Sequence, residues 1–190
     1  MRTMFYPEAV SLSVLINVFF LYSFLGWVME CIVIRREKGH WENRGFAHSP
    51  FCIIYGFGSM LGYAALNPLA DNLVLLFFVG ALTATAFEYL VGRAMQRLFG
   101  DFWWDYSEKK FNYKGILCLE STMGWGLLAL FVILFLHKTV FWLVLRLSDR
   151  TSWWLSFGLS VIYLVDFIFS AKKARREYRG ELEMGKEEQS

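Results

Sequence analysis

Four acidic residues fall inside the long apolar stretches of this sequence, where an ionised side chain is costly to bury. They are Glu30, Glu88, Glu120 and Asp166. Each lies five or six residues from a charged or glycine-marked end of its stretch. At about 1.5 Å per helical residue, all four are expected roughly 7 to 9 Å inside the same face of a membrane. Carboxylates gathered at one depth could bind a proton, another cation, or the head of an amphiphilic substrate.

The spacing of small residues predicts which way three of these acids face. The pairs are Gly26 with Glu30, Glu88 with Gly92, and Glu120 with Gly124, each four residues apart. Residues four apart share a helix face, and small residues allow a neighbouring helix to approach. The available partners are Arg44, Arg93, His48 and Lys114, with the hydroxyls of Tyr55, Tyr89 and Tyr106. Snorkelling side chains or structural ion pairs are the alternative interpretation.

Two polar loops should meet these acids at the same face. The loop 41–50 carries Asn43 and Arg44 and leads directly to Tyr55, and the loop 100–115 carries an aromatic group around Trp104 and Asp105. That aromatic group could gate a substrate or anchor the interface, and we favour the anchor. The sequence thus predicts a polar cavity open to the cytoplasm. Its expected lining is Glu30, Asn43, Arg44, Tyr55, Glu88, Trp104, Asp105, Asn112 and Glu120.

The composition places these residues in an integral membrane protein. With 190 residues that are 56% hydrophobic and 19% aromatic, the chain is too apolar for one soluble core. Five apolar stretches are expected to cross the membrane as helices: 11–34, 51–67, 73–95, 116–137 and 153–171. The nine apolar residues 139–147 are too few for a crossing and predict a short interfacial or re-entrant helix. We therefore expect an all-α polytopic fold, with one transmembrane domain over 1–171 and a charged tail over 172–190.

The distribution of basic residues predicts the orientation. The loop after the first stretch has four Lys or Arg, the turn after the second has none, the aromatic loop with its flanks has five, and the tail has six. The positive-inside bias then puts the N-terminus outside and both polar loops and the tail in the cytoplasm. The tail could bind anionic lipid or a partner, although a stop-transfer role explains it equally well.

Several classes of function lack the residues they would need. The sequence has no P-loop and no HExxH, so we expect no ATP hydrolysis by the chain itself and assign no catalytic residue. We expect no cofactor and no nucleic-acid partner. We also expect no metal site, because the possible ligands show no close pairs in the sequence; they are Cys31, Cys52, Cys118 and His48. The three cysteines are expected to be free and buried. The stripe Gly58-x-x-x-Gly62 is expected to pack against a helix, including one of a second copy.

A set of short phrases in the first two thirds of the chain resembles one bacterial membrane family. The phrases occupy 23–27, 43–46, 54–58, 87–89, 104–106, 111–112, 118–120 and 125–126, with Glu30 and Pro50. In this order they resemble the ABC-transporter type IV, or CmpB-like, permease family over about residues 20–128. The chain departs from that family at 48–54, where the family has Gly-Pro and then Pro-Ile-Tyr-Gly. The resemblance implies a permease-like protein of a bacterial inner membrane whose ATP-binding subunit would be a separate chain.

Three functions remain open on the sequence. The leading hypothesis is a permease subunit that moves a small or amphiphilic solute through the polar cavity, with the loop 100–114 as the candidate contact for an ATPase. The second is an intramembrane enzyme acting on a lipid or isoprenoid head group, with a carboxylate as base and Arg44 holding an anionic group. The third is a non-catalytic membrane scaffold.

Overall fold

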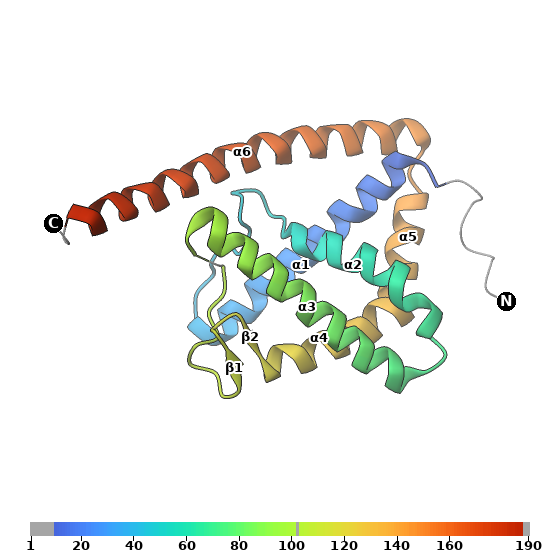
Figure 1. The fold of residues 1–190 in the computed structure, drawn as a ribbon. Helices are drawn as coiled ribbons and strands as arrows, with labels where there is room; N and C mark the ends of the chain where they lie inside the picture. Colours follow the sequence, from blue (N-terminus) through green and yellow to red (C-terminus); the bar gives the residue numbers. More distant parts are fainter. Residues whose placement is uncertain (1–9, 102, 188–190) are drawn as a thin grey trace.

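The computed structural model describes residues 10–101 and 103–187 and consists almost entirely of helices (Figure 1). The helices are α1 (Leu12–Lys38), α2 (Ile53–Leu66), α3 (Leu73–Phe99), α4 (Leu119–Phe131), α5 (His137–Leu145) and α6 (Asp149–Glu187). A 3₁₀ turn (Asn67–Leu69) follows α2, and a π-helical turn (Val132–Leu136) joins α4 to α5. Strands β1 (Asn112–Tyr113) and β2 (Leu117–Cys118) form a small antiparallel hairpin just before α4.

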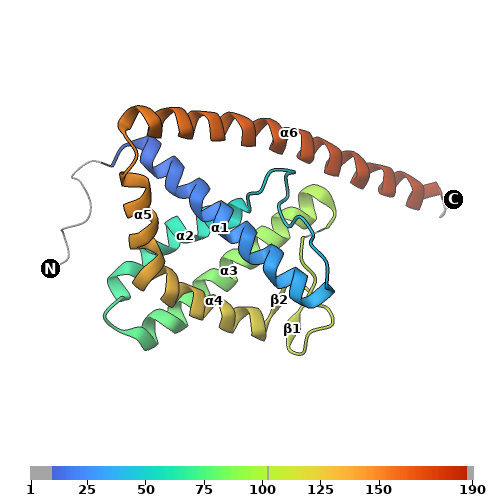
Figure 2. The same ribbon diagram turned by 180° about the vertical axis from the view of Figure 1, so that it is seen from behind.

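Within residues 10–101 and 103–187, four helices are long and apolar enough to cross a membrane. They are Leu12–Lys38, Leu73–Phe99, Leu119–Leu145 and Asp149–Gly180. The fifth expected crossing corresponds to α2, whose 14 residues reach about 21 Å, short of a hydrocarbon core of about 30 Å. Figures 1 and 2 show α1 to α4 running in alternate directions and α5 turning steeply away from the end of α4. Helix α6 lies along one side of the bundle, and its last turns extend past it.

The segment 139–147, which was expected to form a short interfacial or re-entrant helix, corresponds to α5 (His137–Leu145), and α5 follows α4 through the π-helical turn without an intervening loop. Residues Leu119–Leu145 are helical throughout, and Figures 1 and 2 show that the helix bends steeply between α4 and α5, where the π-helical turn lies. The polar residues at 137–139 suggested an end, but His137 is buried and its Nδ1 lies 2.8 Å from the hydroxyl of Tyr22 on α1. Because Tyr22 on a neighbouring helix pairs with Nδ1 of this imidazole, the helix can continue through a polar residue.

Local sequence fixes where α1 and α3 begin and end. Ser11 and Asn72 accept hydrogen bonds from backbone N–H groups in the first turns of α1 and α3, at 3.4 and 3.0 Å. Gly39 and Gly100 end these helices with φ angles of 78° and 80°, a left-handed conformation that favours glycine. The expected domain boundary at residue 171 falls inside α6, which continues to Glu187.

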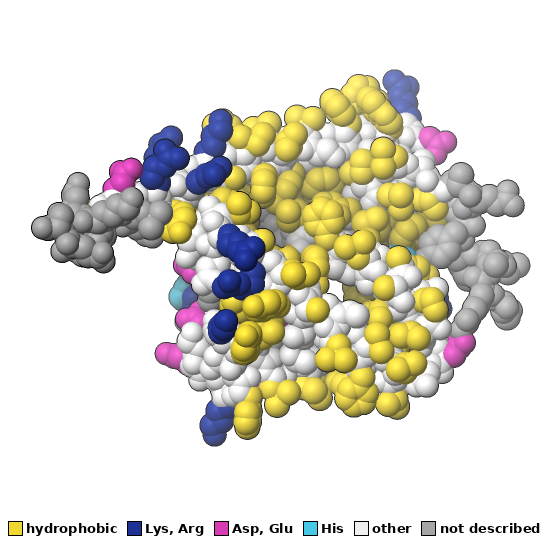
Figure 3. Space-filling view, in the orientation of Figure 1, with side chains coloured by type: hydrophobic (Ala, Val, Ile, Leu, Met, Phe, Trp, Pro, Cys, Tyr) yellow, Lys and Arg dark blue, Asp and Glu magenta, His cyan; other side chains and the backbone are white. Residues whose placement is uncertain are grey.

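The helices pack around three groups of buried side chains. One joins α1 to α5 through Val18, Tyr22 and Val140; another joins α1, α6 and the loop before α2; and the third joins α2, α3 and the π-helical turn. Apolar side chains also cover much of the outer surface, as a lipid-facing surface requires, while basic side chains gather at the end where α1 and α3 finish (Figure 3). This end receives both polar loops.

Candidate functional site

The most deeply buried carboxylate of the described chain is that of Glu88 on α3. Glu88 is only 3% exposed to solvent. Trp125 donates to it from Nε1 at 2.9 Å, Tyr106 from its hydroxyl at 3.2 Å and Ser121 from its hydroxyl at 3.4 Å. Across residues 10–101 and 103–187, no Lys, Arg or His forms an ion pair with it. Three neutral donors therefore hold Glu88 without a compensating cation.

Close packing of α3 against the chain before and within α4 places these donors. A Cβ added at Gly92, one turn after Glu88, would lie 2.7 Å from Cγ2 of Ile116, and one at Gly126 would lie 2.6 Å from Cε2 of Phe77. Only glycine permits such an approach. Ser121 and Trp125, four residues apart on α4, both turn toward α3.

The third donor, Tyr106, comes from the aromatic loop and is fixed by that loop's own hydrogen bonds. Its backbone N–H donates to Gly115 at 2.9 Å, and Trp104 donates from Nε1 to the carbonyl of Ile116 at 2.8 Å. Asn112 donates to the carbonyls of Ser107 and Lys109 and so closes the same loop. Burial, together with the nearby carboxylate of Glu88, raises the pKa of Tyr106, which therefore stays protonated and donates.

A second carboxylate, Glu30 on α1, lies nearer the loop 39–52 and has a cationic neighbour. Tyr55 donates to one of its oxygens, and Nε of Arg44 lies 4.0 Å from the other. Arg44 also donates from Nη2 to the carbonyl of Trp103 at 2.6 Å and so connects the two polar loops. Glu30 is thus a partly compensated acid, unlike Glu88.

The rings of Tyr55 and Trp125 connect the two acids. Their centroids lie 5.8 Å apart, and each ring donates to one of the carboxylates. Glu30 and Glu88 are also near enough to repel each other electrostatically. One polar network therefore extends across α1, α2, α3 and α4.

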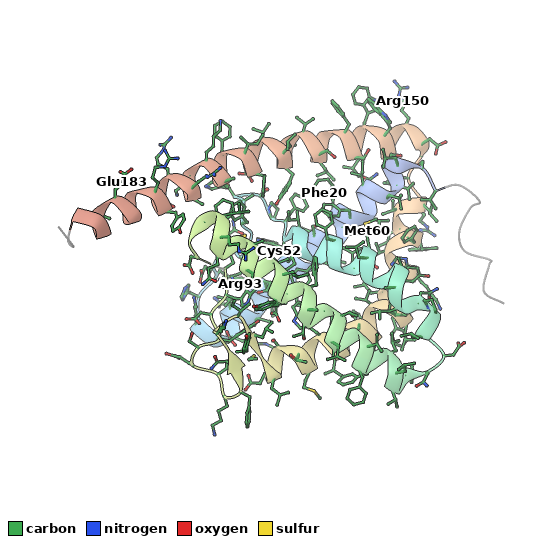
Figure 4. The ribbon with its side chains drawn as sticks, viewed as in Figure 1. Phe20, Cys52, Met60, Arg93, Arg150 and Glu183 are labelled. Atoms are coloured by element: carbon green, nitrogen blue, oxygen red, sulfur yellow. The ribbon has the colours of Figure 1, made fainter. Side chains whose placement is uncertain are left out.

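A cavity of about 230 Å³ begins at this network and extends between α2, α3 and α4 into the π-helical turn. Glu88, Tyr55 and Trp125 line it, and most of the rest of its surface is apolar or aromatic. Gly58 and Gly62 on α2 line it as well, and a Cβ added at Gly62 would meet nothing within 4 Å. Of the glycine stripe that was expected to pack against a helix, Gly58 lies against Phe87 of α3, where a Cβ would be 3.6 Å from Cε1, and Gly62 leaves this space open. Packing of the stripe against a second copy stays a prediction. Figure 4 shows α2 and α3 side by side, with Cys52 labelled at the start of α2 and Met60 along it.

Asn43 holds the loop 39–52 together. It accepts hydrogen bonds from Nε1 of Trp27 at 2.7 Å and from the backbone of Gly45 at 3.0 Å, and it donates to the carbonyls of Ala47 and His48. These contacts occupy its amide, so Asn43 shapes the loop that carries Arg44.

The three cysteines are free and buried, as expected. Cys31 and Cys52 donate to the carbonyls of Glu42 and Arg44. Burial raises the pKa of Cys52 to about 12, so this thiol stays protonated and can donate. Within residues 10–101 and 103–187, no group of three His, Cys, Asp or Glu side chains could hold a metal ion.

The structure brings Glu30, Arg44, Tyr55 and Glu88 together but keeps three other expected residues at the surface. Glu120 is 66% exposed and pairs with Nζ of Lys109 at 3.0 Å, a hydrogen bond that raises the pKa of Lys109. Asp105 is exposed and accepts from the hydroxyl and backbone of Ser107, which lowers its pKa. Asn112 closes its own loop, and Trp104 packs against Gly92, one turn from Glu88, and donates from Nε1 to the carbonyl of Ile116.

Asp166 also differs from expectation, because it joins neither Glu30 nor Glu88. Its carboxylate lies on α6, 3.1 Å from Nδ1 of His48, and it accepts from the backbone of Ser49 at 2.6 Å. This contact ties the loop 39–52 to α6 on the other side of the bundle.

Sequence reasoning missed two of the donors to Glu88. Ser121 was given no role, and Trp125 was noted only as part of a family phrase. Ser121 and Trp125 are four residues apart, and Ser121 comes three residues after Cys118, whose thiol was predicted to be buried. This spacing could have indicated a second polar stripe on α4.

Comparison with protein-family models identifies the family of this chain. A family model described as "Putative ABC-transporter type IV" matches residues 17–171, most of the chain and all of the site. Neither curated proteins nor solved structures give a match.

Proposed function

This chain belongs to the family described as "Putative ABC-transporter type IV", and we propose that it is the membrane permease subunit of a transporter whose solute binds in the cavity beside Glu88. The four helices that can cross a membrane make it a multi-pass membrane protein. We place it in the inner or plasma membrane, with the basic end of the bundle in the cytoplasm.

One observation carries the proposal: the cavity begins at a buried acid that has no cationic partner among the described residues. An isolated buried carboxylate is costly to maintain and is rarely retained for stability. A solute that brought a positive charge or a proton to Glu88 would compensate this cost. The buried carboxylate is therefore expected to have a lower free energy when a solute occupies the cavity than when the cavity is empty, and this difference would favour solute binding.

The chain supplies no nucleotide-binding motif, so energy coupling by ATP requires a second subunit. The segment 100–115 supports such a contact. It lies at the basic end, exposes Phe111 and Tyr113, and is connected to Glu88 through Tyr106. Movement of this loop by a partner would move a donor to the buried acid.

The test is whether the cavity opens to both sides of the membrane. Ala84 lines the cavity, and Leu82 on the same helix is 68% exposed toward the outside of the bundle. In a chain whose native cysteines are replaced by serine, Ala84→Cys should react with a membrane-impermeant maleimide from either side in separate experiments. The control Leu82→Cys should stay unreactive, because it faces lipid. Reaction of Ala84→Cys from one side only, or from neither, would refute a permease.

A further inference from the structure

We infer that the solute of this site is a small organic cation with an apolar body, of the quaternary ammonium class. The inference rests on the proposed function, because it assumes that the cavity is where the solute binds. It adds the charge, the size and the chemistry of that solute.

The charge follows from the donors to Glu88. Both of its oxygens accept hydrogen bonds, one from Tyr106 and the other from Trp125 and Ser121. An ionised carboxylate has about four acceptor positions on its two oxygens, so it can accept all three of these hydrogen bonds at once. Neutral donors lower the energy of this charge but leave its field directed into the cavity, where it attracts a cation and repels an anion.

The chemical class follows from the rest of the lining. Four aromatic side chains, Tyr55, Tyr63, Phe87 and Trp125, surround the same space. Aromatic faces attract cations, and quaternary ammonium groups are recognised by several such rings together with a nearby negative charge. Besides Glu88, the tyrosines and the indole N–H of Trp125, the described lining includes the hydroxyls of Ser59 and Thr83, and its other side chains are apolar. A bare metal ion requires about six oxygen ligands, so this surface suits an alkylated cation far better.

The size follows from the volume of about 230 Å³. Drug-sized ligands occupy pockets of about 300–1,000 Å³, so this cavity suits a smaller molecule. The missing side chains at Gly58 and Gly62 create part of the space, and Leu128, Val132 and Ile133 close it with apolar surface. The cationic head therefore belongs beside Glu88, and the apolar groups belong toward the π-helical turn.

The experiment compares a cation with a neutral molecule of the same shape. Choline and 3,3-dimethylbutan-1-ol differ by the exchange of a quaternary nitrogen for carbon, and 3,3-dimethylbutyrate provides the anion. Binding of each to the purified full-length chain in lipid nanodiscs is measured by titration calorimetry. We expect choline to bind at least tenfold more tightly than the alcohol, and the anion to bind more weakly than either.

The variants Glu88→Gln and Glu120→Gln identify the carboxylate responsible. Glu88→Gln should lose at least tenfold in choline affinity with little change for the alcohol, and Glu120→Gln should leave both unchanged because its side chain is at the surface. Equal binding of choline and the alcohol, or unchanged choline binding by a folded Glu88→Gln protein, would overturn the inference. Either result could occur with Ala84→Cys still labelled from both sides, so it would leave the proposed permease function standing.

Discussion

Glu88 and Glu120 look alike in the sequence, yet the structure gives them opposite environments. Each is an acid inside an apolar stretch with a glycine four residues further on. Glu88 is buried beside the cavity and held by three neutral donors, whereas Glu120 is 66% exposed and pairs with Lys109. The same spacing therefore produced a candidate binding site in one helix and a surface ion pair in the other.

The difference lies in which glycine the neighbouring helix contacts. Gly92, on the face of Glu88, packs against Ile116, and Gly126 packs against Phe77, but a Cβ at Gly124 would meet nothing within 4 Å. Since α4 presents the face of Gly126 to α3, the face of Glu120 and Gly124 points away. A stripe of small residues indicates burial only when another helix fills it.

The largest effect on stability is expected when the packed glycine is changed. A Cβ at Gly92 would be 2.7 Å from the buried side chain of Ile116, so Gly92→Val should overpack the contact and cost about 1–3 kcal/mol in the free energy of unfolding. Gly124→Val is the matched control and should be neutral or slightly stabilising, because valine has the higher helix propensity. Thermal unfolding of both proteins in one detergent measures the difference. Equal melting temperatures of the two variants would contradict the conclusion that Gly92 is packed against a neighbour and Gly124 is not.

A second variant fills the cavity without disturbing the packing. Because nothing lies within 4 Å of a Cβ at Gly62, a leucine can enter the open space. We expect Gly62→Leu to reduce choline affinity at least tenfold while the melting temperature stays the same or rises. Gly124→Leu should change neither quantity beyond a small stabilisation. Full binding by Gly62→Leu would place the ligand elsewhere.

A smaller loss is expected when one donor to Glu88 is removed. Trp125→Phe keeps an aromatic ring but loses the N–H group that lies 2.9 Å from the carboxylate. Phenyl is also a weaker cation–π face than indole, and this difference is worth about 1 kcal/mol of attraction, so choline affinity should fall roughly fivefold. Trp154→Phe, on the exposed side of α6, is the control and should bind as the unmodified chain does. An unchanged choline affinity in Trp125→Phe would show that the indole ring of Trp125 does not contribute to binding of the cation.

The smallest effect concerns the surface acid Asp105. Its hydrogen bonds from Ser107 lower its pKa below the ordinary 3.8, so its contribution to stability is present above pH 3.8 and is lost as the pH falls through the lowered pKa. Asp105→Asn should therefore leave the melting temperature at neutral pH nearly unchanged and flatten its decline only below about pH 4. Melting curves from pH 3 to 7 test this, and a marked loss at neutral pH would assign Asp105 a deeper role.

Much of this architecture could be predicted from the sequence, because apolar stretches and their caps have local causes. The long helices α1, α3 and α6 and the burial of Glu88 followed from hydropathy and from the small residues of α3. The helical connection from α4 through His137 into α5 did not, because the buried contact of His137 with Tyr22 joins residues 115 positions apart. Local polarity suggested an end where a distant partner was available.

Part of the candidate site could be predicted, because some of its residues lie near one another in the sequence. The acid, the arginine and the tyrosine around Glu30 could be inferred, since Tyr55 and Arg44 follow it within one polar loop and its flank. The orientation of α4 could not, because it depends on Gly126 meeting Phe77 on α3. That rotation decides that Ser121 and Trp125 reach Glu88, and that Glu120 does not.

The most direct test of the account is exchange of radiolabelled choline by the purified chain in proteoliposomes preloaded with unlabelled choline, which requires no energy source. The unmodified chain and Glu120→Gln should take up label at the same rate, and Glu88→Gln should not exceed liposomes without protein. Equal exchange by Glu88→Gln, with the protein correctly inserted, would contradict the claim that the cavity beside Glu88 is the solute site.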